Sequence, residues 1–206
     1  MRPDEQGQAE ASEEILGPRV SLRPYLAADA PAVWAAIEES RAHLAQWLLW
    51  VHDYHDVDDV RDYLLRARAV WEQRLDLPLG IFARDDGRFL GGTGLHRIKW
   101  EERHFEIGYW LRLSALHGGF ARETAALLTG LAFRDLGATR VVIRVREENR
   151  ASRRVPEALG FRREGTAPLS EDEPAAGGAL LVYALDREAF LAQPWAGGDG
   201  AELRQK

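Results

Sequence analysis

The chain has 206 residues, of which 46% are hydrophobic, and a formal net charge of −6. This composition suits one globular domain and excludes a disordered chain, while the acidic balance argues against general nucleic-acid binding. The absence of cysteine excludes disulfides, thiolate metal sites and a cysteine nucleophile. No apolar run approaches membrane-spanning length, and the first residues lack the apolar core of a signal peptide, so we expect a cytoplasmic protein with no membrane partner.

The two ends of the chain differ in composition from its middle. Residues 1–17 are polar and acidic, and residues 191–206 are rich in alanine and glycine. We therefore expect a loose N-terminal arm and a loose C-terminal tail on either side of a single domain over residues 18–190. No internal repeat and no linker divides that domain.

The first half of the domain is expected to hold a strand, two helices and a β-hairpin, whereas residues 43–51 have no clear pattern. The expected elements are a strand over Val20–Arg23, a helix from Pro31 to about Ser40 capped by Asp29, a helix from about Asp58 to Leu75 with Pro78 after its end, and strands over Leu79–Arg84 and Phe89–Ile98 around the turn Asp85-Asp86-Gly87-Arg88.

The second half alternates strands and helices less regularly. Its expected elements are a strand over Phe105–Leu111, a helix from about Phe120 to Leu136 ended by Gly137, a strand over Arg140–Arg146, a helix capped by Asn149 that ends at Leu159, and a strand pair over Phe161–Gly165 and Ala179–Leu185 joined by an acidic loop. The order predicts an α/β fold with a mixed, largely antiparallel sheet. The lack of regular βαβ alternation and of a G-x-G-x-x-G motif weighs against a dinucleotide-binding fold.

Two adjacent glycines, Gly118 and Gly119, stand between the expected strand Phe105–Leu111 and the long helix after it. Glycine lets the backbone approach a ligand closely, and the N–H groups at a helix start favour an anion. The segment therefore predicts a cradle for a pyrophosphate, although a Gly-Gly pair is also typical of an ordinary turn.

A basic segment follows in this acidic chain. Between Arg140 and Arg163 there are eight arginines and three glutamates, a local excess of five positive charges. The segment is consistent with an anionic ligand, and equally with the solvated surface of a strand and a helix.

Six potential metal ligands gather between the two expected N-terminal helices, but the histidines at spacing i, i+3 have no sustained helical context. We expect no metal there, and instead expect Asp56 or Asp58 to cap the next helix. The six residues are His52, Asp53, His55, Asp56, Asp58 and Asp59.

Four motifs in fixed order carry a resemblance to a known family. They are Glu106-Ile107-Gly108-Tyr109-Trp110-Leu111, Gly118-Gly119-Phe120-Ala121-Arg122-Glu123, Asn149-Arg150-Ala151-Ser152 and Leu159-Gly160-Phe161-Arg162-Arg163-Glu164-Gly165. Together the motifs resemble the GNAT superfamily of acetyl-CoA-dependent N-acetyltransferases, and most of all its ribosomal-protein N-terminal acetyltransferase branch. Gly91-Gly92-Thr93-Gly94-Leu95-His96 also fits that branch. The resemblance implies a sheet whose central strands, Phe105–Leu111 and Arg140–Arg146, splay apart.

The resemblance also implies an activity. It is direct transfer of an acetyl group from acetyl-CoA, the co-substrate, to a primary amine such as a protein N-terminus, without a metal. The resemblance also makes a homodimer possible, since dimers are common among proteins of this family. Two alternatives stay open: an N-acetyltransferase for a small amine such as an aminoglycoside or a polyamine, and a sensor that binds acyl-CoA without catalysis.

Site residues follow from the resemblance as well. Glu106 is the expected general base, acting through water, or else a strand-end carboxylate that faces solvent or pairs with an arginine, and His96 is an alternative base. Ser152 is either the group that hydrogen-bonds or protonates the departing thiolate or an ordinary first-turn serine, and Asn149 caps the helix and contacts the pantetheine arm. Trp47, Trp50 and His96 are candidates for the acceptor side. The residues expected to bind acetyl-CoA are Tyr109, Trp110, Leu111, Leu113, Leu116, His117, Gly118, Gly119, Phe120, Ala121, Arg122, Asn149, Ser152 and Arg153.

Two positions depart from the family pattern. Leu116 stands where the pyrophosphate loop of the family has Gln or Arg, so one side-chain contact is missing while the backbone cradle is kept. Pro156 lies inside the helix after Asn149, where it removes a backbone hydrogen bond and is expected to kink the helix and loosen the site. Both departures favour the sensor alternative.

Overall fold

The computed structural model describes residues 14–169 and 179–197. The acidic loop between the last two strands therefore lies outside the described residues. In chain order the strands are β1 Ile15–Leu16, β2 Val20–Arg23, β3 Leu77–Ala83, β4 Phe89–Lys99, β5 His104–Leu111, β6 Arg140–Arg146, β7 Arg162–Ala167 and β8 Leu180–Asp186. The helices are α1 Ala30–Leu44, α2 Val57–Glu72, α3 Phe120–Arg134, α4 Arg150–Ala158 and α5 Arg187–Leu191, with short 3-10 helices η1 Ala27–Asp29, η2 Leu49–Asp53 and η3 Leu113–Ala115.

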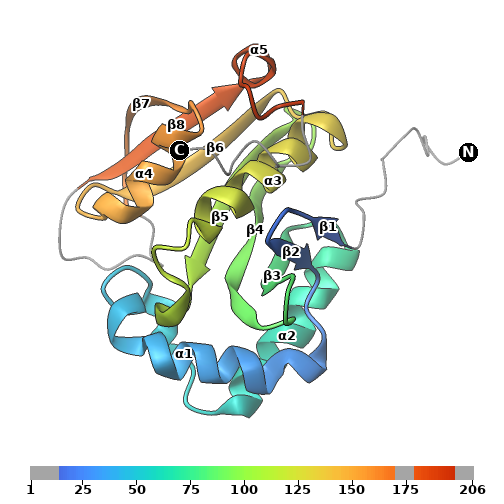
Figure 1. Ribbon diagram of the computed structural model, residues 1–206, viewed down its shortest axis with the longest axis vertical. Helices are drawn as coiled ribbons and strands as arrows, with labels where there is room; N and C mark the ends of the chain where they lie inside the picture. The colour runs from blue at the N-terminus through green and yellow to red at the C-terminus, as the bar shows by residue number, and fades with distance from the viewer. Residues whose placement is uncertain (1–13, 170–178, 198–206) are drawn as a thin grey trace, which may run out of the picture.

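All eight strands form one sheet, in the order β1-β2-β3-β4-β5-β6-β8-β7. Every neighbouring pair is antiparallel except β5 and β6, which are parallel. Helices flank the sheet: α1 and α2 pack beside β3 and β4, and α3 runs along β5 (Figure 1). The expected α/β fold with a mixed, largely antiparallel sheet is confirmed.

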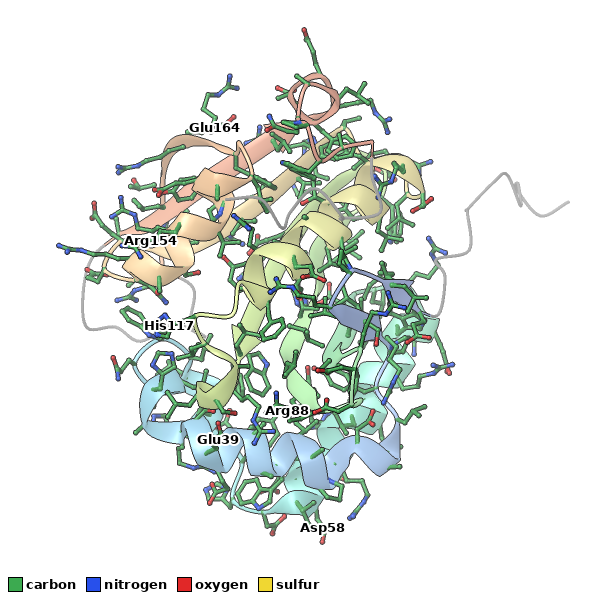
Figure 2. The ribbon with its side chains drawn as sticks, viewed as in Figure 1. Glu39, Asp58, Arg88, His117, Arg154 and Glu164 are labelled. Carbon is green, nitrogen blue, oxygen red and sulfur yellow. The ribbon has the colours of Figure 1, made fainter. Side chains whose placement is uncertain are left out.

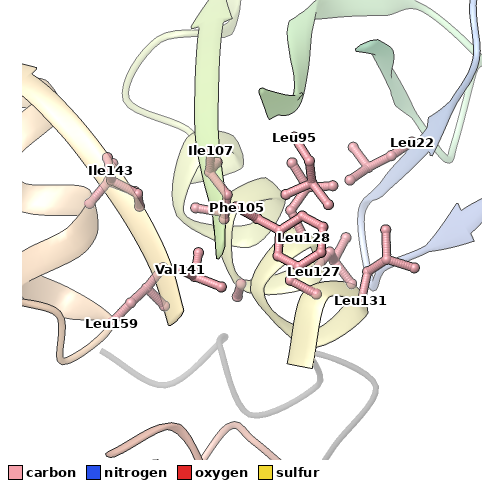
Figure 3. Close-up of a cluster of buried hydrophobic side chains, with 14 of the residues drawn as sticks. Leu22, Leu95, Phe105, Ile107, Leu127, Leu128, Leu131, Val141, Ile143 and Leu159 are labelled. Carbon is pink, nitrogen blue, oxygen red and sulfur yellow. The ribbon is translucent and has the colours of Figure 1, made fainter. Parts of the chain in front are cut away.

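The protein has two hydrophobic cores, one on each face of the sheet. Side chains along β5 point alternately to the two faces and so contribute to both cores. Phe105 and Ile107 face α3, where they pack with Leu127 and Leu128 (Figure 3). Trp110 points to the other face and packs against the second core, which includes Ile37 of α1 and Leu64 of α2. A ligand between β5 and β6 would therefore contact the α3 side of the sheet on one face and the α1–α2 side on the other.

Part of each predicted loose terminal segment belongs to the fold, at residues 14–17 and 191–197. Ile15 and Leu16 pair with β2 as the edge strand β1, and Ile15 packs against the main core. At the other end Trp195 is buried, with its ring centroid 5.6 Å from that of Phe190. Both corrections have the same cause, since each segment carries a large apolar side chain that gains free energy from burial.

Two helix boundaries also differ from expectation. The α1 helix extends four residues past Ser40, because Leu44 is buried and continues the apolar face. The side chain of Asp29 makes no cap hydrogen bond and instead accepts from both terminal nitrogens of Arg23. The α2 helix ends at Glu72, before the expected Leu75, and Pro78, which follows its end as expected, already lies inside β3 opposite Gly94.

Candidate active site

The strands β5 and β6 pair along only part of their length. Their ladder consists of three residue pairs and ends at Glu106 and Val142, although β5 continues to Leu111 and β6 to Arg146. Beyond that point the two parallel strands diverge toward their C-terminal ends (Figure 1). The predicted splay of the central strands is confirmed.

The splay opens into a cavity of about 670 Å³, which we call the larger cavity. Its walls come from the end of α1 and the segment after it, from β5, the turn before α3, the end of β6 and one face of α4, so it joins segments that are far apart in the sequence. Most of the predicted ligand-binding residues line it: Tyr109, Trp110, Leu111, Leu116, His117, Gly119, Phe120, Ala121, Arg122, Asn149 and Ser152.

The glycine turn lies at one end of the larger cavity. Gly119 is the N-cap of α3 and adopts φ 76°, a left-handed conformation that glycine tolerates best, and it has no side chain to occupy the first N–H groups of the helix. Arg19 holds the turn from outside: its Nη1 donates to the carbonyl of Gly118 over 2.8 Å, and its Nε donates to Glu123 over 2.8 Å. The carbonyl of Gly118 therefore points to the side chain of Arg19, and Gly118 is absent from the residues that line the larger cavity.

The start of α4 forms the opposite wall. Asn149 caps this helix as predicted, since its Oδ1 accepts from the N–H of Ser152 over 3.0 Å. The hydroxyl of Tyr109 reaches across from β5 and lies 3.2 Å from Oγ of Ser152. Burial raises the pKa of Tyr109 above its ordinary value, so the phenol stays protonated at neutral pH and can donate a hydrogen bond.

Arg154, and not Arg153, faces the larger cavity. The lining residues of α4 include Ala151, Arg154, Val155 and Ala158, which fall on one face at spacing i, i+3, i+4 and i+7. Arg153 lies on another face, where its Nη1 donates to the carbonyl of Glu147. Figure 2 shows Arg154 on the same side of the molecule as His117, another lining residue.

The basic segment contributes further charge to the larger cavity. Arg144 and Arg146 at the end of β6 also line it. Other members of the segment are used in the fold, for example Arg140, which pairs with Glu164. Only part of the predicted positive charge is therefore directed at the cavity.

Glu106, the predicted general base, is bound by two arginine side chains. Its Oε1 accepts from Arg97 over 2.7 Å, and its Oε2 accepts from Nε and Nη2 of Arg144 over 2.8 and 2.6 Å. Arg97 reaches it because a bulge in β4 gives this residue a positive φ of 47°. Glu106 lines neither of the two cavities described here.

A second, smaller cavity of about 360 Å³ lies on the face of the sheet that α1 and α2 cover. It contains two of the predicted acceptor-side residues, His96 and Trp50, while the third, Trp47, lines the larger cavity. The two cavities are adjacent, since Leu48, Tyr109 and Trp110 line both.

Several residues of these cavities were not found from the sequence. Tyr25, Tyr54 and Tyr63 line the smaller cavity, and Asp76 contacts His96 beside it. These four residues come from four separate places in the chain, so no spacing in the sequence connects them. Leu113, by contrast, was predicted to bind the ligand but is half-exposed in η3, where its N–H donates to Ser40.

No three of the possible ligands His, Cys, Asp and Glu gather into a metal-binding group within residues 14–169 and 179–197. Over the same residues, no helix combines the length and the apolar character needed to cross a bilayer. Asp56, one of the acidic residues before α2, caps that helix by accepting from the N–H groups of Asp58 and Asp59.

Comparison with known proteins agrees with this geometry. Residues 19–162 match the family described as the acetyltransferase (GNAT) domain. YoaA of Bacillus subtilis, named as an uncharacterized N-acetyltransferase, is 26% identical over 147 residues, which make up 71% of this chain and 81% of YoaA.

Solved structures are similar over most of the chain. RimJ of Mycobacterium smegmatis, solved in complex with a CoA disulfide, has a TM-score of 0.75 at 29% identity and covers 86% of both chains. RimL, a ribosomal L7/L12 α-N-protein acetyltransferase solved with coenzyme A, has a TM-score of 0.78 at 22% identity, covering 86% of this chain and 99% of its own. The likeness to RimL shows the fold alone. Given the family match over most of its length, the chain belongs to the GNAT family and is an N-acetyltransferase.

Proposed function

We propose that the protein transfers an acetyl group from acetyl-CoA directly to a primary amine, with a protein N-terminal α-amine as the first acceptor to test. The observation that carries the proposal is the larger cavity between the diverging strands β5 and β6, with the glycine turn at one end. RimJ, at 29% identity, was solved with a CoA disulfide in complex, and RimL is named for an α-amine acceptor.

The phosphate end of acetyl-CoA suits the glycine turn. Gly119 offers main-chain N–H groups at the start of α3, where the helix dipole favours negative charge. The cationic side chains of Arg144, Arg146 and Arg154 line the same cavity and suit a polyanion. Backbone donors therefore replace the side-chain contact that Leu116 cannot make.

The pantetheine arm suits the edge of β5 that β6 leaves unpaired in the described chain. Within the described chain, residues 107–111 pair with β4 on one side but have no ladder partner on the β6 side. A ligand with amide groups can hydrogen-bond to such an edge in the manner of an added strand. Tyr109, Trp110 and Leu111 lie at this edge and line the cavity.

The reacting end of acetyl-CoA is assigned to the region of Tyr109 and Ser152. Acetyl-CoA supplies the acetyl group as a thioester, whose thiolate is a good leaving group. The hydroxyl of Ser152 lies 3.2 Å from that of Tyr109 and can donate a hydrogen bond to a developing thiolate. No covalent enzyme intermediate is part of the proposal, because positioning two substrates side by side supplies much of the rate.

Leu116 and Pro156 are the two departures that favour the sensor alternative, and the contacts of α4 weaken the argument from Pro156. Pro156 was expected to loosen α4, but the carbonyl that it leaves without a helical donor, that of Ser152, accepts from the hydroxyl of Tyr109 over 3.1 Å. The helix and β5 are thereby tied together across the site.

The test measures acetyl-CoA binding by calorimetry and thiol release with a panel of small amines and N-terminal peptides. The expected result is binding of acetyl-CoA and thiol release that requires an amine. Gly119→Trp is expected to abolish binding. Gly87→Trp is the matched control, since Gly87 has a similar φ of 70° and open space around it in the β3–β4 turn. Absence of acetyl-CoA binding by the wild-type chain would refute the proposal, and binding without amine-dependent thiol release would favour the sensor.

A further inference from the structure

The smaller cavity exists because its floor is made of glycine. A Cβ atom on Gly92 would lie 2.4 Å from Nε1 of Trp110 and 2.6 Å from the hydroxyl of Tyr25, so no larger residue fits there. Gly108 on β5, which pairs with Gly94 of β4, also lines the cavity. Tyr109 and Trp110 line both this cavity and the larger one, so its contents lie next to the region assigned to the thioester.

Aromatic rings form the walls of the smaller cavity. The ring centroids of Trp50 and Trp110 are 5.6 Å apart, those of Trp50 and Tyr54 are 5.7 Å apart, and those of Tyr54 and Tyr63 are 6.0 Å apart. Such rings attract an ammonium group and also bury the short apolar chain attached to it. The cavity thus suits a small primary amine, or the amine end of a larger one, that enters as its ammonium form.

His96 offers a proton acceptor to this cavity. Its Nδ1 lies 3.2 Å from Oδ2 of Asp76. An ionised carboxylate accepts a hydrogen bond from Nδ1–H, and this leaves the lone pair on Nε2. Nε2 lies over the glycine floor, 3.4 Å from the position that a Cβ of Gly108 would take. No hydrogen bond to Nε2 is present in the described part of the chain.

The other titratable groups around His96 are not available as bases. Burial raises the pKa values of Tyr25, Tyr54 and Tyr63 above the ordinary value, so these phenols stay protonated at neutral pH. Glu106 lies directly opposite His96 in the β4–β5 ladder. However, both of its oxygens accept hydrogen bonds from the guanidinium groups of Arg97 and Arg144.

We propose that the smaller cavity binds the acceptor amine, that His96 and not Glu106 removes its proton, and that Asp76 is the positioning residue that fixes the tautomer of His96. The inference rests on the proposed function. Nε2 takes one proton from the ammonium, and the amine nitrogen then forms a C–N bond with the carbonyl carbon while the C–S bond breaks. The sulfur leaves with the electron pair of that bond. The second proton of the nitrogen is lost as the amide forms, so one proton protonates the thiolate and one reaches solvent.

The first experiment is independent of the acceptor. Long-range ¹H–¹⁵N spectra of the full chain distinguish the two neutral tautomers of a histidine. The expected result is an Nδ1–H tautomer for His96 in the wild type, and a shift toward Nε2–H in Asp76→Asn. An Nε2–H tautomer in the wild type would overturn the proposal.

The second experiment compares two acceptors of similar size, ethylamine and 2,2,2-trifluoroethylamine, with acetyl-CoA. The fluorinated amine is far less basic and is largely neutral at pH 7, so its transfer gains little from a base. His96→Gln is expected to lower kcat/KM for ethylamine on the order of 100-fold or more, and for the fluorinated amine much less. Asp76→Asn is expected to have a smaller effect of the same kind and to move the acidic limb of the pH–rate profile.

The structure offers a matched control pair. His104 on β5 lies 3.1 Å from Glu102 through its Nδ1, and its exposure of 38% is close to the 34% of His96, but it lines neither cavity. His104→Gln is expected to leave the kinetics with both amines unchanged. If His96→Gln fails to fold, His96→Ala with imidazole added to the buffer is expected to recover activity, whereas Glu106→Gln would gain nothing from imidazole.

The outcomes separate this inference from the proposed function. Equal losses for both amines in His96→Gln, or transfer to neither amine by the wild type, would overturn the acceptor-pocket assignment even where acetyl-CoA binds in calorimetry. Failure of acetyl-CoA to bind would instead overturn the proposed function, while the tautomer of His96 would still be measurable.

Discussion

The hydroxyl of Tyr109 donates to the main-chain carbonyl of Ser152 over 3.1 Å, and this is the carbonyl to which residue 156 of α4 would donate if it were not proline. In an α-helix the N–H of each residue binds the carbonyl four positions earlier, and proline has no N–H. A side chain of β5 therefore fills the position that Pro156 leaves open. It also connects the two walls of the larger cavity.

We predict that Tyr109→Phe destabilises the fold by about 1–2 kcal/mol, because the Ser152 carbonyl loses its donor in a half-buried position. Urea unfolding measures the change. The same substitution is expected to cost less in a Pro156→Ala background, where residue 156 has an N–H to offer. Equal costs in the two backgrounds would show that the tyrosine and the proline are not coupled.

We predict that Glu123→Gln lowers both stability and acetyl-CoA affinity. This buried carboxylate accepts from the main-chain N–H groups of Arg19 and Val20 and from Nε of Arg19, which in turn holds Gly118. The expected loss is about 1–3 kcal/mol in the free energy of unfolding, since strong charge-assisted hydrogen bonds are lost in a buried place.

Glu72→Gln is the control for Glu123. Glu72 pairs with Arg68 on the surface of α2, with 60% of its side chain exposed. Its replacement is expected to change stability by less than about 1 kcal/mol and to leave the ligand affinity unchanged. A loss in Glu123→Gln no larger than in this control would contradict the role assigned to Arg19 and Glu123.

We predict that Arg154→Ala weakens acetyl-CoA binding by roughly tenfold or more, because a cation facing the larger cavity is removed. Arg153→Ala is the control, since Arg153 is adjacent in sequence but lies on a different face of α4. Calorimetry at two salt concentrations measures both. A larger loss for Arg153 than for Arg154 would restore the role that the sequence predicted for Arg153.

Acid stability is predicted to depend in part on Glu39. Hydrogen bonds from Arg112, and from the N–H of Ser114 over 2.7 Å, lower the pKa of Glu39 from 4.5 to about 2. Because this pKa is lower in the folded chain than in the unfolded one, the contribution is present above pH 4.5 and is lost as the pH falls toward 2. Its size is expected to be below about 1 kcal/mol, since the side chain is partly exposed.

The measurement for Glu39 is urea unfolding of the wild type and Glu39→Gln at about pH 6, 4 and 3. The difference in the free energy of unfolding between the two proteins is expected to shrink as the pH decreases. A constant difference at all three pH values would contradict the assignment.

Local sequence signals predicted several elements well. The bounds of β2 and β6 agree with the predicted strands, since both segments alternate or cluster branched apolar residues. Asn149 caps α4 and Asp56 caps α2 because an Asn or Asp side chain binds the first N–H groups without help from tertiary structure. The splayed strands and the residues around the glycine turn followed from the family motifs.

Features that depend on tertiary contacts were beyond the sequence. Asp29 was predicted to cap α1, but its carboxylate is bound by Arg23 from β2. The choice between Arg153 and Arg154 depends on the rotation of α4 against β6, which a list of residues does not fix. Asp76 lies 20 positions from His96, and only the pairing of β3 with β4 brings the two together.

The short ladder between β5 and β6 divides the sheet into a five-stranded part, β1 to β5, and a three-stranded part made of β6, β8 and β7. Three residue pairs form the seam between them. A molecule bound between the unpaired ends of β5 and β6 would contact both parts of the sheet, so its binding energy would stabilise the sheet against separation of the two parts. Melting temperature and amide exchange along residues 107–111 would then report ligand occupancy as directly as turnover does.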